Sequence, residues 1–178
     1  MPTIITHGFV GLIGGKIFTE KEKLKFWILS VLIPIIPDFD VIAFRFGIPY
    51  ESMLGHRGFS HSIIFAFVLA LIVMFAAFRE IKSGTKQWFQ YLVFFFLIAL
   101  SHPILDAFTN GGLGVGLLIP LTNERFFAPF RPIEVSPIGI KRFLDGSAFV
   151  VLFSEFLWVW IPFLTIYLCK ILVKKFSK

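Results

Sequence analysis

Charged side chains are scarce in this sequence of 178 residues. Asp, Glu, Lys and Arg together make up 16% of it, whereas a soluble globular domain carries about 25%. Hydrophobic residues account for 57%, and 25 residues are phenylalanine. This composition excludes an ordinary soluble domain and predicts an all-α, polytopic helical membrane protein. The length accommodates one membrane-embedded domain, residues 1–178, and is too short for two.

Cysteine is nearly absent as well. The single Cys169 excludes a disulfide within the chain and any metal site built from several thiolates. The first residues show neither a basic n-region nor a small-residue cleavage site, so a signal peptide is not expected. The formal net charge of +6 would suit nucleic acid, but no basic stripe is interleaved with aromatic residues. No nucleic-acid partner is therefore expected.

Long apolar runs fill most of the chain and predict four or five membrane helices, some of them interrupted or re-entrant. The runs are residues 3–18, 26–44, 58–78, 87–105 and 147–170. The third and fourth carry no formal charge over 21 and 19 residues, which is long enough to cross a hydrocarbon core of about 30 Å. The first would cover only about 24 Å as a helix, so it is expected to be tilted or partly inserted.

Prolines and a serine set the expected helix boundaries. Pro34 and Pro37 should interrupt the second run, with a helix restarting at Pro37, because proline removes a backbone donor and clashes with the preceding turn. Ser60 is the expected N-cap of the third run. Pro103 predicts a kink or restart in the fourth run, and Pro162 predicts a kink in the last. Residues 107–146 read as a long, Gly- and Pro-rich loop.

The basic residues predict the orientation in the membrane. If all five runs cross, one side receives eleven of the 17 Lys and Arg residues, namely four in 16–25, three in 79–86 and four in 170–178. The positive-inside rule places that side in the cytoplasm of a multi-pass inner-membrane protein. The long loop and every histidine then fall on the non-cytoplasmic side.

Four short motifs together contain the four histidines and three aspartates. They are Thr6-His7, Pro37-Asp38-Phe39-Asp40, His56–Ser62 (HRGFSHS) and Ser101–Asp106 (SHPILD). His102 and Asp106 are four residues apart, so on a helix they share one face and can bind one metal ion. Asp38 and Asp40 are two apart, point in different directions on a helix and should have different roles. Structural alternatives remain open: a helix cap for the aspartates, a buried His–Asp hydrogen bond, and interfacial or core histidines.

The cost of burying carboxylates favours a metal. Three aspartates in apolar surroundings cost on the order of 2.5–3.5 kcal/mol each, and hydrogen bonds return only about 0.6–2 kcal/mol each. A bound dication contributes roughly 10–16 kcal/mol. A ligand set of imidazoles and carboxylates suits Zn²⁺ best, and Mn²⁺ or Fe²⁺ also fit. Seven candidate ligands exceed what one tetrahedral ion needs, so two or three ions are expected.

Other polar residues could assist such a site. Arg57 could hold a phosphate, pair with an aspartate or simply set the topology, and Arg125 and Arg131 could also clamp a phosphate. Glu155 could be a ligand, could support a ligating histidine or could form an interhelical hydrogen bond. Ser60 is a further candidate for supporting a ligand.

In this order, the four motifs resemble those of the membrane-bound metal-dependent hydrolases of the YdjM-like, LexA-regulated inner-membrane family. The resemblance covers about residues 6–140 and includes the segment Arg125–Gly139. More distantly, the pattern is similar to zinc-dependent phospholipases C and related nucleases, which cleave phosphodiesters with three zinc ions. The resemblance implies the following metal-site set: His7, Asp38, Asp40, His56, His61, His102 and Asp106.

The expected function is therefore hydrolysis of a phosphoester or phosphodiester in a phospholipid or lipid-linked substrate by a metal-activated water. The expected catalytic residues are Asp38, Asp40 and Asp106, with Asp38 or Asp40 bridging the ions and the other free to act as general base. Two other classes stay open: a metal-ion or proton transporter, and a non-catalytic membrane protein with a structural metal site. The substrate, the metal count and the oligomeric state do not follow from the sequence.

Overall fold

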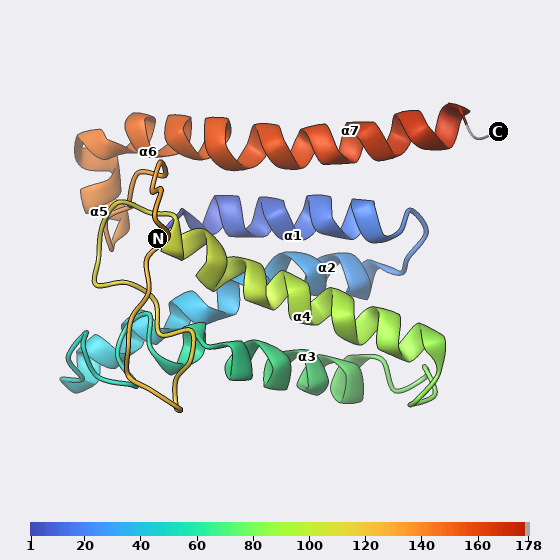
Figure 1. The fold of residues 1–178 in the computed structure, drawn as a ribbon, viewed down its shortest axis with the longest axis horizontal. Coiled ribbons are helices and arrows are strands. Elements are labelled where there is room, and N and C mark those ends of the chain that lie inside the picture. Colours follow the sequence, from blue (N-terminus) through green and yellow to red (C-terminus); the bar gives the residue numbers. More distant parts are fainter. Residues whose placement is uncertain (177–178) are drawn as a thin grey trace.

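The protein is an antiparallel bundle of long helices, seen here in a computed structural model that describes residues 1–176 except for the side chain of Ile140 (Figure 1). The first segments are α1 (Ile4–Phe18), α2 (Leu24–Leu32) continued by the 3₁₀ helix η1 (Ile33–Phe46), the short 3₁₀ turn η2 (Phe59–His61), α3 (Ile63–Ala77) and α4 (Lys86–Ala107). The C-terminal segment joins α5 (Ile140–Arg142), the π turn η3 (Phe143–Ser147), α6 (Ala148–Glu155), the π turn η4 (Phe156–Trp160) and α7 (Ile161–Phe176). No strand occurs within residues 1–176, which confirms the all-α fold.

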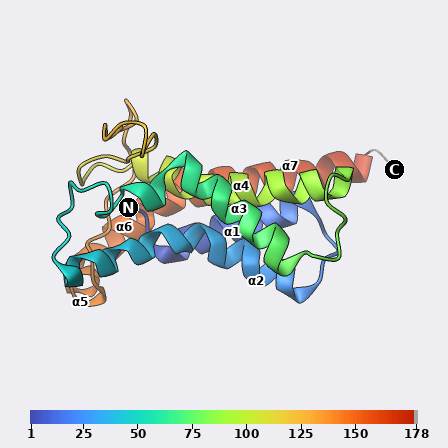
Figure 2. The same cartoon turned by 90° about the horizontal axis from the view of Figure 1, so that it is seen from below.

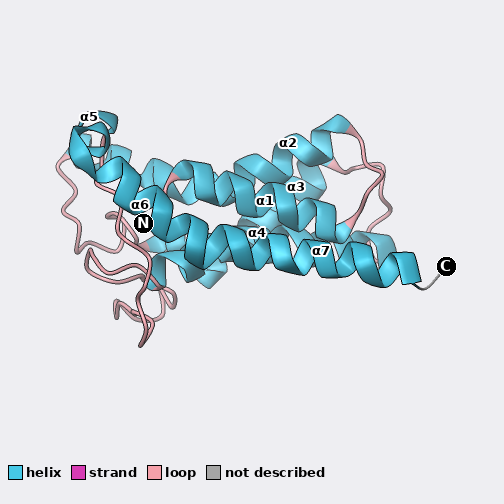
Figure 3. Ribbon diagram, turned by 90° about the horizontal axis from the view of Figure 1, so that it is seen from above, coloured by secondary structure: helices cyan, strands magenta, loops and turns pink. Residues whose placement is uncertain are grey.

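Successive long segments run in opposite directions along the bundle (Figures 1 and 2). The start of α1, the end of η1, the start of α3 and the end of α4 therefore meet at one end. Two long loops, residues 47–58 and 108–139, gather at that same end (Figure 3). The opposite end carries the shorter connections between α1 and α2 and between α3 and α4.

Three segments are long and apolar enough to cross a membrane: Leu24–Phe46, Lys86–Ala107 and Phe143–Phe176. The helices α1 and α3 are also apolar but only 15 residues long, about 22 Å each. Many large hydrophobic side chains point outward, such as Phe75, Leu97 and Phe149. Apolar outer surfaces of this extent are expected where helices face lipid.

Several predicted boundaries were wrong. The third helix begins at Ile63 rather than near residue 58, and Ser62 is its N-cap, accepting a hydrogen bond from the Phe65 N–H. Ser60 lies instead in η2, because residues 59–61 form a 3₁₀ turn before the helix. The last helical segment starts earlier and ends later than the predicted 147–170.

The predicted interruption of the second run occurs at Pro34, because α2 ends at Leu32 and the chain continues as the 3₁₀ helix η1. The helix restarts predicted at Pro37 and Pro103 do not occur. Pro37 lies inside η1, where the chain tightens into a 3₁₀ helix and continues without a restart. Pro103 lies inside α4, which is unbroken to Ala107. Pro162 lies in the first turn of α7, directly after the wider π turn η4, a common site of irregularity within a long helix.

The larger hydrophobic cluster occupies the half of the bundle away from the long loops. Phe26 of α2 stacks on Phe94 of α4 with ring centroids 5.0 Å apart, and Phe95 is fully buried beside them. Towards the other end, Gly11 lets α1 approach α2 closely, since an added Cβ would lie 1.9 Å from the carbonyl oxygen of Ser30. This close approach positions the first turns of α1 against η1.

Candidate metal centre

Seven titratable side chains converge at the end of the bundle that the long loops cover. They are His7 from α1, Asp38 and Asp40 from η1, His56 from the following loop, His61 from η2, and His102 and Asp106 from α4. Four of them are fully buried, and the side chains of His56, Asp38 and Asp40 are only 2%, 4% and 7% exposed. Buried charges of this kind require ion partners or a metal.

Tight 3₁₀ winding separates the two aspartates of η1. Residues two apart on a 3₁₀ helix, at three residues per turn, are rotated by about 240° and therefore point about 120° apart. Asp38 faces α4, with its Oδ1 3.4 Å from His102 Nε2. Asp40 faces the His56–His61 segment. The prediction that the two carboxylates have different surroundings therefore agrees with the geometry.

One group of candidate ligands consists of His7, His102 and Asp106. Each offers one ligand atom, and the three atoms lie within 4.8 Å of one another. The rings of His7 and His102 are stacked with centroids 3.8 Å apart. Asp106 Oδ1 lies 3.6 Å from His7 Nε2, and its Oδ2 lies 4.0 Å from His102 Nε2, one helical turn away.

A second group with the same spacing consists of Asp38, His56 and His61. The two groups are contiguous, because His61 Nε2 lies 3.0 Å from His102 Nε2 and 3.4 Å from Asp106 Oδ2. Six side chains thus form two adjoining sets of three, each matching the ligand number of a catalytic zinc site.

Hydrogen bonds behind the rings fix two tautomers. His102 Nδ1 lies 2.6 Å from the carbonyl oxygen of Pro34, which can only accept, so Nδ1 carries the proton. His61 Nδ1 faces Asp40 Oδ2 at 3.1 Å in the same way. Neutral rings would then direct two Nε2 lone pairs at each other across 3.0 Å. Only a proton or a metal cation between the two Nε2 atoms relieves that repulsion. A backbone carbonyl or a carboxylate that accepts from Nδ1–H is also the usual support of a metal-ligating histidine.

The surroundings of His61 favour positive charge. Burial alone would lower the pKa of His61, but the neighbouring carboxylates of Asp106 and Asp40 outweigh burial and raise it to about 9. The carboxylates therefore attract a cation to this point, whether it is a proton or a metal ion.

Unsatisfied polar atoms also mark the cluster. Both ring nitrogens of His7 and both carboxylate oxygens of Asp38 and Asp106 are buried without a hydrogen bond within residues 1–176. Each such atom costs about 1–3 kcal/mol unless something else satisfies it. Atoms of this type in this number fit divalent cations, because imidazole nitrogens and carboxylate oxygens are their ordinary ligands.

Asp40 is the most heavily hydrogen-bonded member. Its Oδ1 lies 2.5 Å from His56 Nδ1, and its Oδ2 accepts hydrogen bonds from the Arg57 N–H and the Ser60 hydroxyl as well as facing His61. Asp40 was predicted as a ligand, a bridge between ions or a general base, and that role stays a prediction. In the structure it lies behind His56 and His61, where it orients both rings, and Ser60 supports it.

Arg57 pairs with an aspartate, one of the roles left open from the sequence. Its Nε lies 2.9 Å from Asp106 Oδ2, and its two terminal nitrogens donate to the Gly111 carbonyl and the Thr109 hydroxyl. The side chain is 1% exposed, and the backbone adopts a left-handed conformation with φ of 60°. Gly112, with φ of +87°, leaves room beside it, since a Cβ there would lie 2.8 Å from Arg57 Nη1.

The other two arginines lie further out. Arg125 donates to the carbonyl oxygens of His56, Tyr50 and Ser52, and thereby holds the loop that carries His56. Burial lowers the pKa of Arg125. Arg131 lies over the ring of Phe127, 4.6 Å from its centroid.

Glu155 forms an interhelical hydrogen-bond network next to His7. It accepts from the N–H and hydroxyl of Thr3 and from the hydroxyl of Thr6, and Trp160 Nε1 donates to the same Thr6 hydroxyl. This network fixes the first turn of α1 against α6 and η4. Thr3 and Trp160 were not predicted from the sequence, although the polar Thr6 directly before His7 was a usable signal.

A small cavity of about 80 Å³ borders the cluster beneath the long loops. Its walls include Tyr50, His56, Arg57, Gly112 and Ser136. Burial raises the pKa of the Tyr50 hydroxyl, so this group is a neutral hydrogen-bond donor at pH 7. The cavity thus brings polar donors next to one histidine of the cluster.

Comparison with known proteins shows that this chain is similar to inner membrane proteins. The chain matches the model of a family described as YdjM inner membrane protein over residues 1–177. Inner membrane protein YbcI of Escherichia coli (strain K12) is 39% identical over 163 residues, covering 91% of this chain and 92% of the relative. No solved structure matches the chain. The match over nearly the whole sequence shows that this chain belongs to the YdjM inner membrane protein family.

Proposed function

We propose that the protein is a membrane-embedded metal-dependent hydrolase that cleaves a phosphoester or phosphodiester of a lipid or lipid-linked substrate. The observation that carries this proposal is the convergence of six buried candidate ligands, three of which, His7, Asp38 and Asp106, keep ring nitrogens or carboxylate oxygens without a hydrogen bond within residues 1–176. A site that served only as a hydrogen-bonded core would pair these atoms with donors.

The two groups of three would each hold one divalent ion: His7, His102 and Asp106 the first, and Asp38, His56 and His61 the second. Zn²⁺ suits this ligand set best, and Mn²⁺ or Fe²⁺ also fit. When bound in such sites, divalent ions lower the pKa of water and stabilise charge that develops on phosphate oxygens.

The remaining side chains have roles that follow from their contacts. Asp40 orients two of the histidines and keeps their protons on Nδ1. Arg57 neutralises Asp106 with its Nε, and two of its five N–H donors remain for a phosphate oxygen in the adjoining cavity. Asp38, whose oxygens have no hydrogen bond within the described residues, is the carboxylate placed to bind an ion or accept a proton.

Two considerations support a lipid-phosphate substrate outside the cytoplasm. The cluster lies at one end of a membrane bundle, so a substrate anchored in the bilayer would reach it without leaving the membrane. The basic segments 16–25, 79–86 and 170–175 lie at the other end (Figure 1), which by the positive-inside rule faces the cytoplasm. The aromatic core around Phe26, Phe94 and Phe95 fills the bundle beyond the cluster, which argues against a transport path.

The test is metal-dependent turnover by the purified full-length protein in detergent. Bound metal is measured by mass spectrometry, and phosphate or diacylglycerol release is measured from phosphatidic acid, a monoester, and phosphatidylglycerol, a diester. We expect turnover to stop after chelation and to return with Zn²⁺ or Mn²⁺. Asp106→Asn should abolish it, and Asp145→Asn, which changes an exposed carboxylate, should not.

Two results would reject the proposal. Turnover that survives complete metal removal would exclude a metal-dependent reaction. Tightly bound metal with no turnover of either lipid, together with metal or proton flux in proteoliposomes, would assign the protein to transport; the same result without flux would assign a structural metal.

A further inference from the structure

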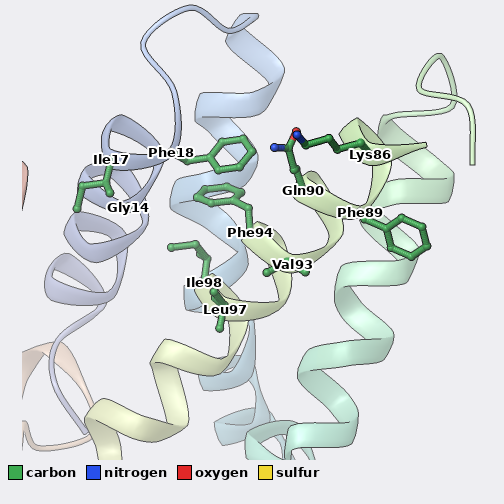
Figure 4. Close-up of a pocket in the computed structure, with 10 residues that line it drawn as sticks. All are labelled: Gly14, Ile17, Phe18, Lys86, Phe89, Gln90, Val93, Phe94, Leu97 and Ile98. Atoms are coloured by element: carbon green, nitrogen blue, oxygen red, sulfur yellow. The ribbon is translucent and has the colours of Figure 1, made fainter. Parts of the chain in front are cut away.

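A large apolar groove lies between α1 and α4, in the half of the bundle away from the metal centre (Figure 4). It has a volume of about 890 Å³. Gly14 and Phe18 of α1 form one wall, and Val93, Leu97 and Ile98 of α4 form the other. At its narrow base the helices are in close contact, since a Cβ added at Gly14 would lie 2.5 Å from Ile98 Cδ1.

One end of the groove is polar. Lys86 and Gln90 both extend over it beside Phe18 (Figure 4). Both side chains are exposed, and neither makes a hydrogen bond or ion pair within residues 1–176. By contrast, Lys25 at the same end of the bundle pairs with Glu80. Lys86 therefore presents an uncompensated positive charge at the mouth of an apolar groove.

The length of the groove matches one leaflet of a bilayer. Along α4 it extends from Lys86 to Ile98, which is about 18 Å at a rise of 1.5 Å per residue. Half of a hydrocarbon core of about 30 Å is roughly 15 Å. The apolar end stops at Ile98, one helical turn before His102, so the groove is separate from the metal centre.

We propose that this groove binds one acyl chain of an anionic phospholipid from the leaflet at the Lys86 end of the bundle, with the lipid phosphate against Lys86 and Gln90. Charge complementarity selects this occupant. Lys21 and Lys23 lie in the connection between α1 and α2 at the same end of the bundle, and they add to the positive potential there.

The charge, rather than the apolar walls, provides the selectivity. An acyl chain gains little by moving from bulk lipid into an apolar groove, because lipid tails are as apolar as the side chains that line it. A basic residue near an anionic headgroup favours binding by about fivefold. The groove positions the chain, and Lys86 then discriminates between anionic and zwitterionic headgroups.

Native mass spectrometry of the full-length protein tests this inference. The protein is released from detergent with an equimolar mixture of phosphatidylglycerol and phosphatidylcholine, after chelation so that turnover cannot consume lipid. We expect the wild type to retain mainly phosphatidylglycerol. Lys86→Gln should lower the ratio of the two bound lipids about fivefold, and Lys82→Gln, which removes the same charge outside the groove, should leave it unchanged.

A second pair of variants tests the groove itself. Val93→Trp places an indole in the groove and should reduce retention of both lipids, whereas Leu168→Trp on the exposed face of α7 should not. Equal effects of Lys86→Gln and Lys82→Gln would show a diffuse surface charge and overturn the proposal, as would unchanged retention in Val93→Trp. If Val93→Trp does not give the helical circular dichroism of the wild type, the comparison of Lys86→Gln with Lys82→Gln decides whether the proposal holds. The readout does not depend on hydrolysis.

Discussion

The buried ion pair between Arg57 and Asp106 allows a sharp test of the metal centre. Arg57→Met keeps much of the side-chain volume but removes the guanidinium, and so leaves Asp106 without its cationic partner at 2.9 Å. Removing one member of a buried pair costs about 3–5 kcal/mol. The Gly111 carbonyl and the Thr109 hydroxyl would also lose a donor, which adds about 1–3 kcal/mol for each group left unsatisfied.

Metal should reverse part of this loss. A divalent ion bound by Asp106 supplies the positive charge that Arg57 no longer provides, so metal should stabilise Arg57→Met more than it stabilises the wild type. Thermal unfolding in detergent, followed by tryptophan fluorescence with and without Zn²⁺, measures both effects. We expect the metal-free variant to unfold at least about 10 °C below the wild type, and Zn²⁺ to reduce this difference.

The control is Arg131→Met, which changes an exposed arginine that stacks on Phe127. It should shift the unfolding temperature by a small amount that Zn²⁺ does not alter. An equal loss of stability in Arg57→Met with and without metal would refute the reasoning, because it would show that Asp106 does not share its charge with a bound ion.

Three further predictions concern the ligands and their supports. His102→Ala should lower the bound Zn²⁺ by at least one ion per chain, as measured by mass spectrometry of the purified protein. Asp40→Asn keeps the shape but cannot serve both histidines as an acceptor, so competition with a chromogenic chelator should show a loss of Zn²⁺ affinity of about 10–100-fold. Gly11→Ala places a Cβ 1.9 Å from the Ser30 carbonyl oxygen and should destabilise the protein by at least about 1–3 kcal/mol in thermal unfolding. Gly8→Ala, whose Cβ would lie 3.3 Å from a methyl group of Val31, should cost clearly less; equal losses would contradict this interpretation.

Local spacing and the alternation of membrane crossings made much of the site predictable. His102 and Asp106 share a helical face whatever surrounds them. The convergence of four distant motifs follows once each apolar run crosses and the next one returns, since every motif then lies at the same end. The alternation of crossings alone does not predict the position of His7, because α1 is short and its approach to α2 depends on Gly11.

The roles of individual residues could not be read from the sequence. Whether Asp40 binds an ion or orients two histidines depends on how η1 packs against the His56–His61 segment, which local spacing does not determine. The choice of Ser62 over Ser60 as N-cap depends on a 3₁₀ turn that brings Ser60 to Asp40. The pairing of Arg57 requires a left-handed backbone, a conformation that is rare for arginine.

The single carboxylate of Asp40, placed behind two imidazoles, makes their orientations interdependent. If Asp40 turned to follow one ring, it would withdraw an oxygen from the other, because one oxygen serves His56 and the other serves His61. A substitution that removes either imidazole should therefore also disturb the orientation of the other one. In a double-mutant cycle, the losses of metal affinity caused by replacing His56 and His61 should be markedly non-additive.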